Sequence, residues 1–156
     1  MSNTLCRVYV HLVWSTEDRV PRVEAAFEAR IWGAMRSLGE RRGCEVVAVG
    51  GVEDHVHALI WLNPACDIAS IVHGMKLSAS GIARVHLATT VPWQRGYGVF
   101  PVSPRQVPGV RRYIIHQRER HARGDLIPAL ERYPIDPPDD GWSRGLSAAT
   151  VTATPR

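Results

Sequence analysis

Four short segments rich in β-branched and aromatic residues alternate with three segments that carry helical signals. The strand-like segments are residues 5–14, 45–49, 55–62 and 96–102. The helix-like segments are residues 27–38, 68–83 and 104–123. Side chains alternate faces along a strand but repeat about every 3.6 residues along a helix, so these patterns predict the element order β-α-β-β-α-β-α.

Local signals place the ends of these elements. The glycine pair at 50–51 suits a hairpin turn between the second and third strands. Asp67 can cap the second helix, and Gly124 supplies a stop for the third. Pro101 restricts the last strand to an edge or a bulge, and Pro108 moves the start of the third helix toward the C-terminus.

The element order is that of an α+β, ferredoxin-like (split βαβ) fold with an antiparallel sheet. We expect helices packed on one face of this sheet, a further C-terminal helix, and the other face free for a partner. Residues 1–133 form one predicted domain. The Pro/Asp-containing segment 134–156 has no apolar period, which predicts a docked or disordered tail.

The composition of the chain and the spacing of its cysteines exclude several classes of protein. The chain has 156 residues, 45% apolar and 22% charged, which is typical of one globular domain and excludes collagen-like and wholly disordered chains. Three widely spaced cysteines without a Cys-x-x-Cys pair predict neither a disulfide framework nor a thiolate zinc site. No apolar run is long enough to cross a membrane. We therefore expect a cytoplasmic protein without membrane contact.

The positive charge of the chain is concentrated in the third predicted helix. Nineteen basic and fifteen acidic residues give a net charge of +4, and all the basic residues except Lys76 are arginines. Residues 105–123 contain six arginines and one glutamate, which is +5 by difference. The guanidinium fork suits phosphate oxygens, so this helix is expected to face an anionic partner. The alternative is a solvated helix face.

Two pairs of residues suggest a chemical site. His55 and His57 flank one residue of a predicted strand, so both imidazoles point to the same face and can share a divalent ion once an oxygen ligand completes the set. Tyr113 and Gln117 are four residues apart, on the same side of a helix. Spacing alone does not distinguish Gln117 from His116 as a third ligand, and for Tyr113 it favours a core position.

Several motifs follow one another in the order of a known family. They are 11–14 (HLVW), 51–57 (GVEDHVH), Lys76 with Ser78, 93–103 (WQRGYGVFPVS), and Tyr113-Ile114 with Gln117 and His121. Together they resemble the single-tyrosine transposases of the insertion-sequence-200/605 type, which are small members of the HUH (His-hydrophobe-His) nuclease group. The likeness covers nearly the whole chain outside the tail.

The resemblance implies that residues 1–133 are a catalytic domain on a ferredoxin-like fold. It makes Tyr113 the nucleophile and makes His55, His57 and Gln117 the ligands of Mg²⁺ or Mn²⁺. The implied reaction cleaves and rejoins single-stranded DNA at hairpin-marked element ends through a 5′-phosphotyrosine intermediate. The implied assembly is a homodimer, in which the tyrosine helix can complete the partner's metal site.

Candidate DNA contacts and two other functions complete the sequence-based picture. The residues expected to contact DNA are Lys76, Ser78, Arg111, Arg112 and Arg118. The first alternative is a non-catalytic nucleic-acid-binding descendant with the same fold. The second is an unrelated metal-dependent hydrolase, which needs carboxylate ligands that the sequence does not place near the histidine pair.

Overall fold

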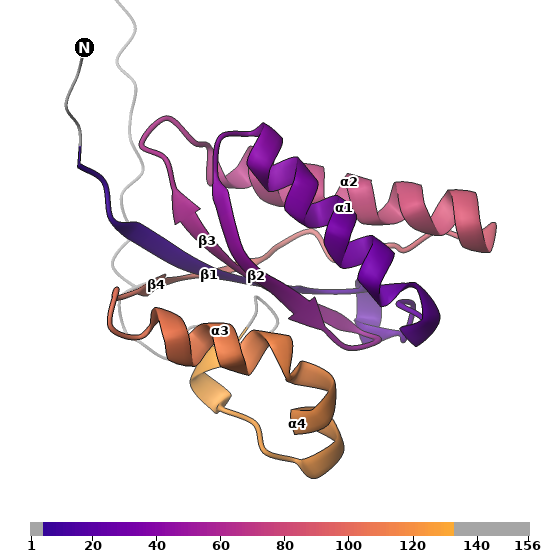
Figure 1. Ribbon diagram of the computed structural model, residues 1–156. Coiled ribbons are helices and arrows are strands. Elements are labelled where there is room, and N and C mark those ends of the chain that lie inside the picture. The colour runs from indigo at the N-terminus through magenta and orange to yellow at the C-terminus, as the bar shows by residue number, and fades with distance from the viewer. Residues whose placement is uncertain (1–4, 133–156) are drawn as a thin grey trace, which may run out of the picture.

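The computed structural model describes residues 5–132 (Figure 1). In this part of the chain the strands are β1 (Val8–Ser15), β2 (Glu45–Gly51), β3 (His55–Leu62) and β4 (Gly98–Val102). The α-helices are α1 (Glu28–Arg41), α2 (Ile68–Leu87), α3 (Val107–Ile115) and α4 (Gln117–Arg123). The predicted α+β fold is confirmed. The predicted tail, 134–156, lies outside the described residues.

The strands form one antiparallel sheet in the order β2-β3-β1-β4. Pro101 lies on β4, whose only strand neighbour among the described residues is β1. Proline has no N–H to donate to a ladder, so an edge strand is where a sheet tolerates it. The sequence-based placement of Pro101 at an edge is confirmed.

Helices α1 and α2 cover one face of the sheet (Figure 1). Alternate strand residues point into this layer, including Leu12 and Trp14 of β1, which are fully buried. Met75 of α2 meets them in the same apolar cluster. The carboxylate of Asp67 accepts hydrogen bonds from the backbone N–H groups of Ala69 and Ser70, so the predicted cap of α2 is confirmed.

The opposite face of the sheet is covered by α3 over β2 and β3, rather than being free (Figure 1). Val110 and Ile114 of α3 pack against Ala48 of β2 and Leu59 of β3 in a second apolar cluster. The expectation of an open face was wrong because α3 has an apolar stripe of its own, which it buries here.

The third predicted helix is interrupted at His116, whose φ of −107° and ψ of 21° are not helical. α3 ends at Ile115 and α4 begins at Gln117. Beyond the break, Arg118 forms ion pairs with Glu28 and Glu53, which hold α4 against the start of α1 and the β2–β3 turn. A local pattern does not predict such long-range ion pairs.

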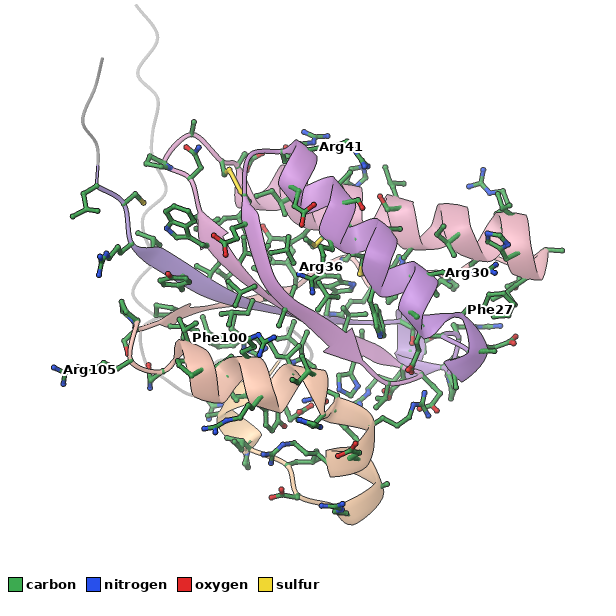
Figure 2. All side chains as sticks on the ribbon, viewed as in Figure 1. Phe27, Arg30, Arg36, Arg41, Phe100 and Arg105 are labelled. Carbon is green, nitrogen blue, oxygen red and sulfur yellow. A yellow bond between two sulfur atoms is a disulfide. The ribbon has the colours of Figure 1, made fainter. Side chains whose placement is uncertain are left out.

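Cys44 and Cys66 are joined by a disulfide, the yellow bond in Figure 2. The sequence-based expectation of unpaired cysteines is therefore corrected. Glu45 and Trp61 are partners in the β2–β3 ladder, which brings the chain before β2 close to the chain after β3.

Within the described residues, no helix is long and apolar enough to cross a membrane.

Gly50 of β2 lies directly against the backbone of α3. A Cβ at this position would overlap the backbone carbonyl of Ile114. Gly50→Ala is therefore expected to displace α3 and to lower the free energy of unfolding by about 1–3 kcal/mol. Urea unfolding measures the change. The matched control is Gly109→Ala on α3, where a Cβ meets open space; equal midpoints for the two variants would contradict the prediction.

Candidate metal centre and tyrosine site

Three buried histidines lie on the sheet face that α3 covers. His55 and His57 come from β3, and His11 comes from β1, where it lies beside them. The rings of His55 and His57 are 5.0 Å apart between centroids, which confirms that the two imidazoles share one face. Strand alternation explains this, because Val56 between them points into the opposite apolar layer.

Each imidazole of the pair is held through its Nδ1 atom. His57 Nδ1 lies 2.9 Å from His11 Nε2, and His55 Nδ1 lies 2.7 Å from a carboxylate oxygen of Asp54. Such contacts fix the orientation of a ring and leave Nε2 to face a ligand. His11 and Asp54 therefore position the pair.

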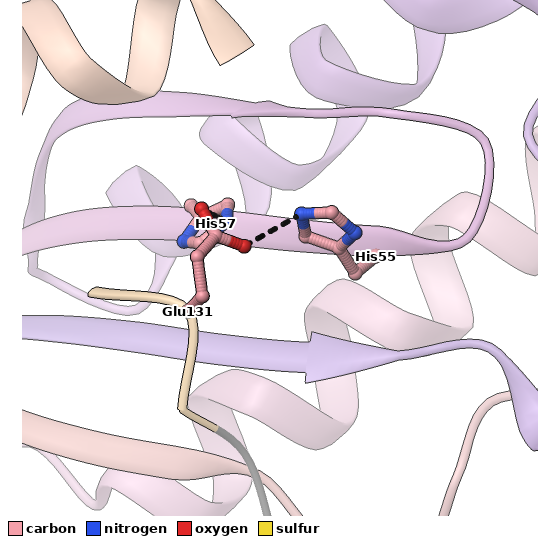
Figure 3. A group of neighbouring side chains, drawn as sticks. All are labelled: His55, His57 and Glu131. Carbon is pink, nitrogen blue, oxygen red and sulfur yellow. Dashed lines mark ion pairs between the residues drawn. The ribbon is translucent and has the colours of Figure 1, made fainter. Parts of the chain in front are cut away.

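Glu131 completes a cluster that the sequence does not predict (Figure 3). One carboxylate oxygen lies 3.2 Å from His55 Nε2, and the other lies 3.5 Å from His57 Nε2. The chain turns at Gly124, whose φ is +67°, and returns along α3 to bring Glu131 to the histidines. No spacing signal marks this residue, so the sequence alone could not place a carboxylate near the pair, whereas the structure brings one there.

Tyr113 reaches the same carboxylate from α3. Its hydroxyl donates a hydrogen bond to Glu131 Oε1 and accepts one from the backbone N–H of Ile127 at 3.2 Å. The Tyr113 ring lies 6.0 Å from the His57 ring, edge to face, and the Arg120 guanidinium lies 5.0 Å from the Tyr113 ring centroid. Tyr113 is thus both a buried packing residue and a member of the site.

Gln117 also contacts Glu131, although the helix breaks between it and Tyr113. Its Nε2 lies 3.4 Å from Glu131 Oε1, and the side chain is buried. His116, the other candidate for a third ligand, is exposed and has its Nδ1 3.3 Å from Glu119. Of these two alternatives, the structure brings only Gln117 to the histidine pair.

Burial and neighbouring charges set the protonation of the cluster. Burial lowers the pKa of His57. Burial, together with the repulsion that a protonated His57 would exert, lowers the pKa of His11 to about 3. Burial opposes ionisation of Glu131, but its contacts with His55 and His57 outweigh burial and lower its pKa. Burial also lowers the pKa of His55, but contacts with Asp54 and Glu131 raise it overall. The result is an ionised carboxylate beside a neutral His57, the ligand forms that a metal requires.

The donor set fits a divalent cation. One ligand atom from each of His55, His57 and Glu131 lies within 4.8 Å of the others. Beside them, Gln117 Oε1 and His121 Nε2 are buried without a hydrogen-bond partner among the described residues. Buried polar atoms are normally satisfied, so these atoms are consistent with a ligand at this position. Two imidazole nitrogens with carboxylate and amide oxygens suit a hard or borderline ion.

The sequence matches the model of the family "Transposase IS200 like" over residues 4–117. The chain belongs to this family. The family is catalytic, and the histidine and glutamate cluster described above is consistent with a metal site in it. The match ends before Glu131, so this carboxylate lies outside the matched segment.

Two solved structures share the fold of this IS200-like transposase. A protein of Deinococcus radiodurans R1 assigned as a transposase has a TM-score of 0.60 and 21% identity, over 75% of this chain and 95% of its own. A REP-associated tyrosine transposase bound to a REP hairpin has a TM-score of 0.57 and 14% identity, over 81% of this chain and 76% of its own. Among curated proteins, none matches the chain in sequence.

The residues expected to contact DNA lie on opposite sides of the sheet. Lys76 and Ser78 are half-buried on α2, whereas Arg111 and Arg112 are exposed on α3. Arg118 is engaged with two carboxylates. The structure therefore does not bring these five residues to one surface, and part of the positive charge of residues 105–123 is neutralised within the chain.

Proposed function

We propose that this IS200-like transposase cleaves and rejoins single-stranded DNA with Tyr113 as the nucleophile. The observation that carries the proposal is that the Tyr113 hydroxyl and the two imidazoles of the HUH motif converge on one carboxylate, Glu131. The substrate is single-stranded DNA with hairpins near the element ends. This follows from the sequence resemblance, and the structural neighbour bound to a REP hairpin supports it.

The residues that would hold a cation are His55, His57, Glu131 and Gln117, the last through its buried Oε1. Mg²⁺ and Mn²⁺ are the ions proposed, since both prefer oxygen ligands and accept imidazole. A divalent cation bound there polarises a non-bridging oxygen of the scissile phosphate and neutralises developing charge.

Tyr113 supplies the oxygen that attacks phosphorus. The new bond joins Tyr113 Oη to phosphorus, the bond from phosphorus to the 3′-oxygen breaks, and the 3′-oxygen leaves as a hydroxyl by taking a proton. Burial and the hydrogen bond to Glu131 raise the pKa of Tyr113 to about 12, so the phenol is protonated at neutral pH. The hydrogen bond to Glu131 Oε1 gives this proton a direct path away from Oη.

The phosphotyrosine product explains how the strands are rejoined. The ester conserves the energy of the broken phosphodiester, so a later 3′-hydroxyl can attack phosphorus and release Tyr113 without ATP. Tyr113 and the histidine pair meet within one chain, which supports attack at the same chain's site. The homodimer that the resemblance implies, with a tyrosine helix that can complete the partner's site, stays a prediction.

The direct test is formation of a covalent protein–DNA adduct. Incubation of the protein with a single-stranded oligonucleotide carrying the element-end hairpin and Mn²⁺ is expected to give a slower band on a denaturing gel. Removal of the metal with EDTA should abolish this band, and a fully paired duplex of the same sequence should not form it. Absence of any adduct with the correct element-end DNA would contradict the proposed chemistry.

A non-catalytic DNA-binding role is the second candidate. It is favoured by Arg105, Arg111 and Arg112, which are exposed and have no ion pair among the described residues. A protein of this kind binds DNA with a strong salt dependence but without a metal requirement. The adduct separates the two functions, because a protein with only this second role binds the hairpin DNA with or without Mn²⁺ but forms no covalent adduct.

A further inference from the structure

A cavity of about 520 Å³ lies between α2 and the segment 91–97, on the sheet face opposite the histidine pair. Polar and aromatic side chains share its lining with aliphatic ones. The polar and aromatic members are His73, Lys76, Ser80, Trp93, Gln94, Arg95 and Tyr97. Its volume is in the range that holds a compact organic ligand.

The cavity carries positive charge that the protein does not neutralise. Lys76 Nζ donates hydrogen bonds to the backbone carbonyls of Gln94 and Gly96 at 2.8 and 2.9 Å, which leaves a third N–H available. Among the residues that the structure describes, no carboxylate lines the cavity. Arg95 at its mouth is exposed and has no ion pair among the described residues. Burial lowers the pKa of Lys76 to about 8, which still keeps it mostly protonated at neutral pH. An anionic group complements this lining.

Two aromatic side chains, Trp93 and Tyr97, also line the cavity. Trp93 is held in place, since its Nε1 donates to the carbonyl of Lys76 at 3.0 Å and its ring packs edge-on against Trp14. Tyr97 is half-buried, and its hydroxyl has no hydrogen-bond partner among the described residues. Unpaired bases stack on aromatic side chains, and a free hydroxyl can meet the polar edge of a base.

The wall of the cavity is attached to the strand end beside His55. Gln94 donates its backbone N–H to the carbonyl of Ser15 at 3.1 Å, and the Ser15 hydroxyl donates to Gln94 Oε1 at 2.6 Å. Ser15 is the ladder partner of His55. The cavity wall is therefore joined, through the end of β1, to the strand end that carries His55.

We propose that this cavity binds one nucleotide of the single-stranded DNA, with its base against Tyr97 and its phosphate at Lys76 and Arg95. The proposal rests on the proposed function, since it adds a second contact with the same substrate. Binding here holds an unpaired nucleotide at a fixed place on the chain, apart from the nucleotide that Tyr113 attacks.

The test measures binding of a short fluorescein-labelled oligothymidylate, which forms no hairpin, by fluorescence anisotropy in EDTA. Arg95→Gln is expected to reduce the slope of log K against log salt by about 0.7, the value for one phosphate contact on a single strand. Tyr97→Leu is expected to weaken binding by about tenfold through lost stacking. The matched control, Arg84→Gln, removes an exposed arginine of α2 outside the cavity and should change neither quantity.

The outcomes separate this proposal from the proposed chemistry. Unchanged affinity and salt slope in both cavity variants would overturn the nucleotide site, whatever the adduct experiment gives. Equal losses for a blunt duplex and for oligothymidylate would also overturn it, because a paired base cannot enter the cavity. If the variants lose single-strand affinity while the wild-type protein forms no adduct, the cavity stands as a binding site and the tyrosine chemistry fails. Arg95 is exposed, so its variant is expected to fold.

Discussion

Tyr113→Phe is expected to lower the rate of covalent adduct formation by at least about a thousandfold, because it removes the only atom proposed to attack phosphorus. The phenyl ring keeps its packing against His57 and Arg120, so affinity for hairpin DNA should change by less than about twofold. Denaturing gels measure the adduct, and gel shifts in EDTA measure the affinity.

Tyr9→Phe is the matched control for this variant. Tyr9 lies on β1 and packs against the apolar cluster on the same sheet face, and among the described residues no hydrogen bond or ring contact joins it to the histidine pair. Its variant should form the adduct at the wild-type rate. An adduct that persists in Tyr113→Phe would show that another residue is the nucleophile and would remove Tyr113 from the mechanism.

His57→Ala is expected to weaken Mn²⁺ binding by at least about 100-fold and to abolish the adduct at micromolar metal. The variant removes Nε2, which faces Glu131, and also leaves His11 without its partner. Titration of free Mn²⁺ by electron paramagnetic resonance measures the affinity without any turnover. His86→Ala, an exposed histidine of α2, is the control and should bind Mn²⁺ as the wild type does. Equal affinities for the two variants would contradict a metal site at the HUH motif.

A mixture of the Tyr113→Phe and His57→Ala proteins tests where the tyrosine acts. If each chain uses its own tyrosine, as the intrachain hydrogen bond from Tyr113 to Glu131 suggests, neither protein supplies a complete site and the mixture stays inactive. Recovery of adduct formation, approaching about a quarter of the wild-type level for random exchange in a dimer, would show a site shared between two chains.

The sequence alone determined the features that depend on local periodicity. His55 and His57 share a face because a strand alternates its side chains, whatever surrounds it. Pro101 lies at an edge because it lacks an N–H, and Asp67 caps α2 because its side chain reaches the first free backbone donors. The order of these elements was sufficient to predict the α+β fold.

Tertiary structure decided which distant groups meet. Glu131 joins the histidine pair only because the chain reverses at Gly124 and returns along α3. Arg118 was expected to contact DNA. Instead it forms ion pairs with Glu28 and Glu53, which lie far from it in sequence. Burial of α3 on the second sheet face brings Tyr113 to this carboxylate. Periodicity along one element indicates which side is apolar but not what covers it. The carboxylate of the candidate metal centre could therefore be identified only in the folded chain.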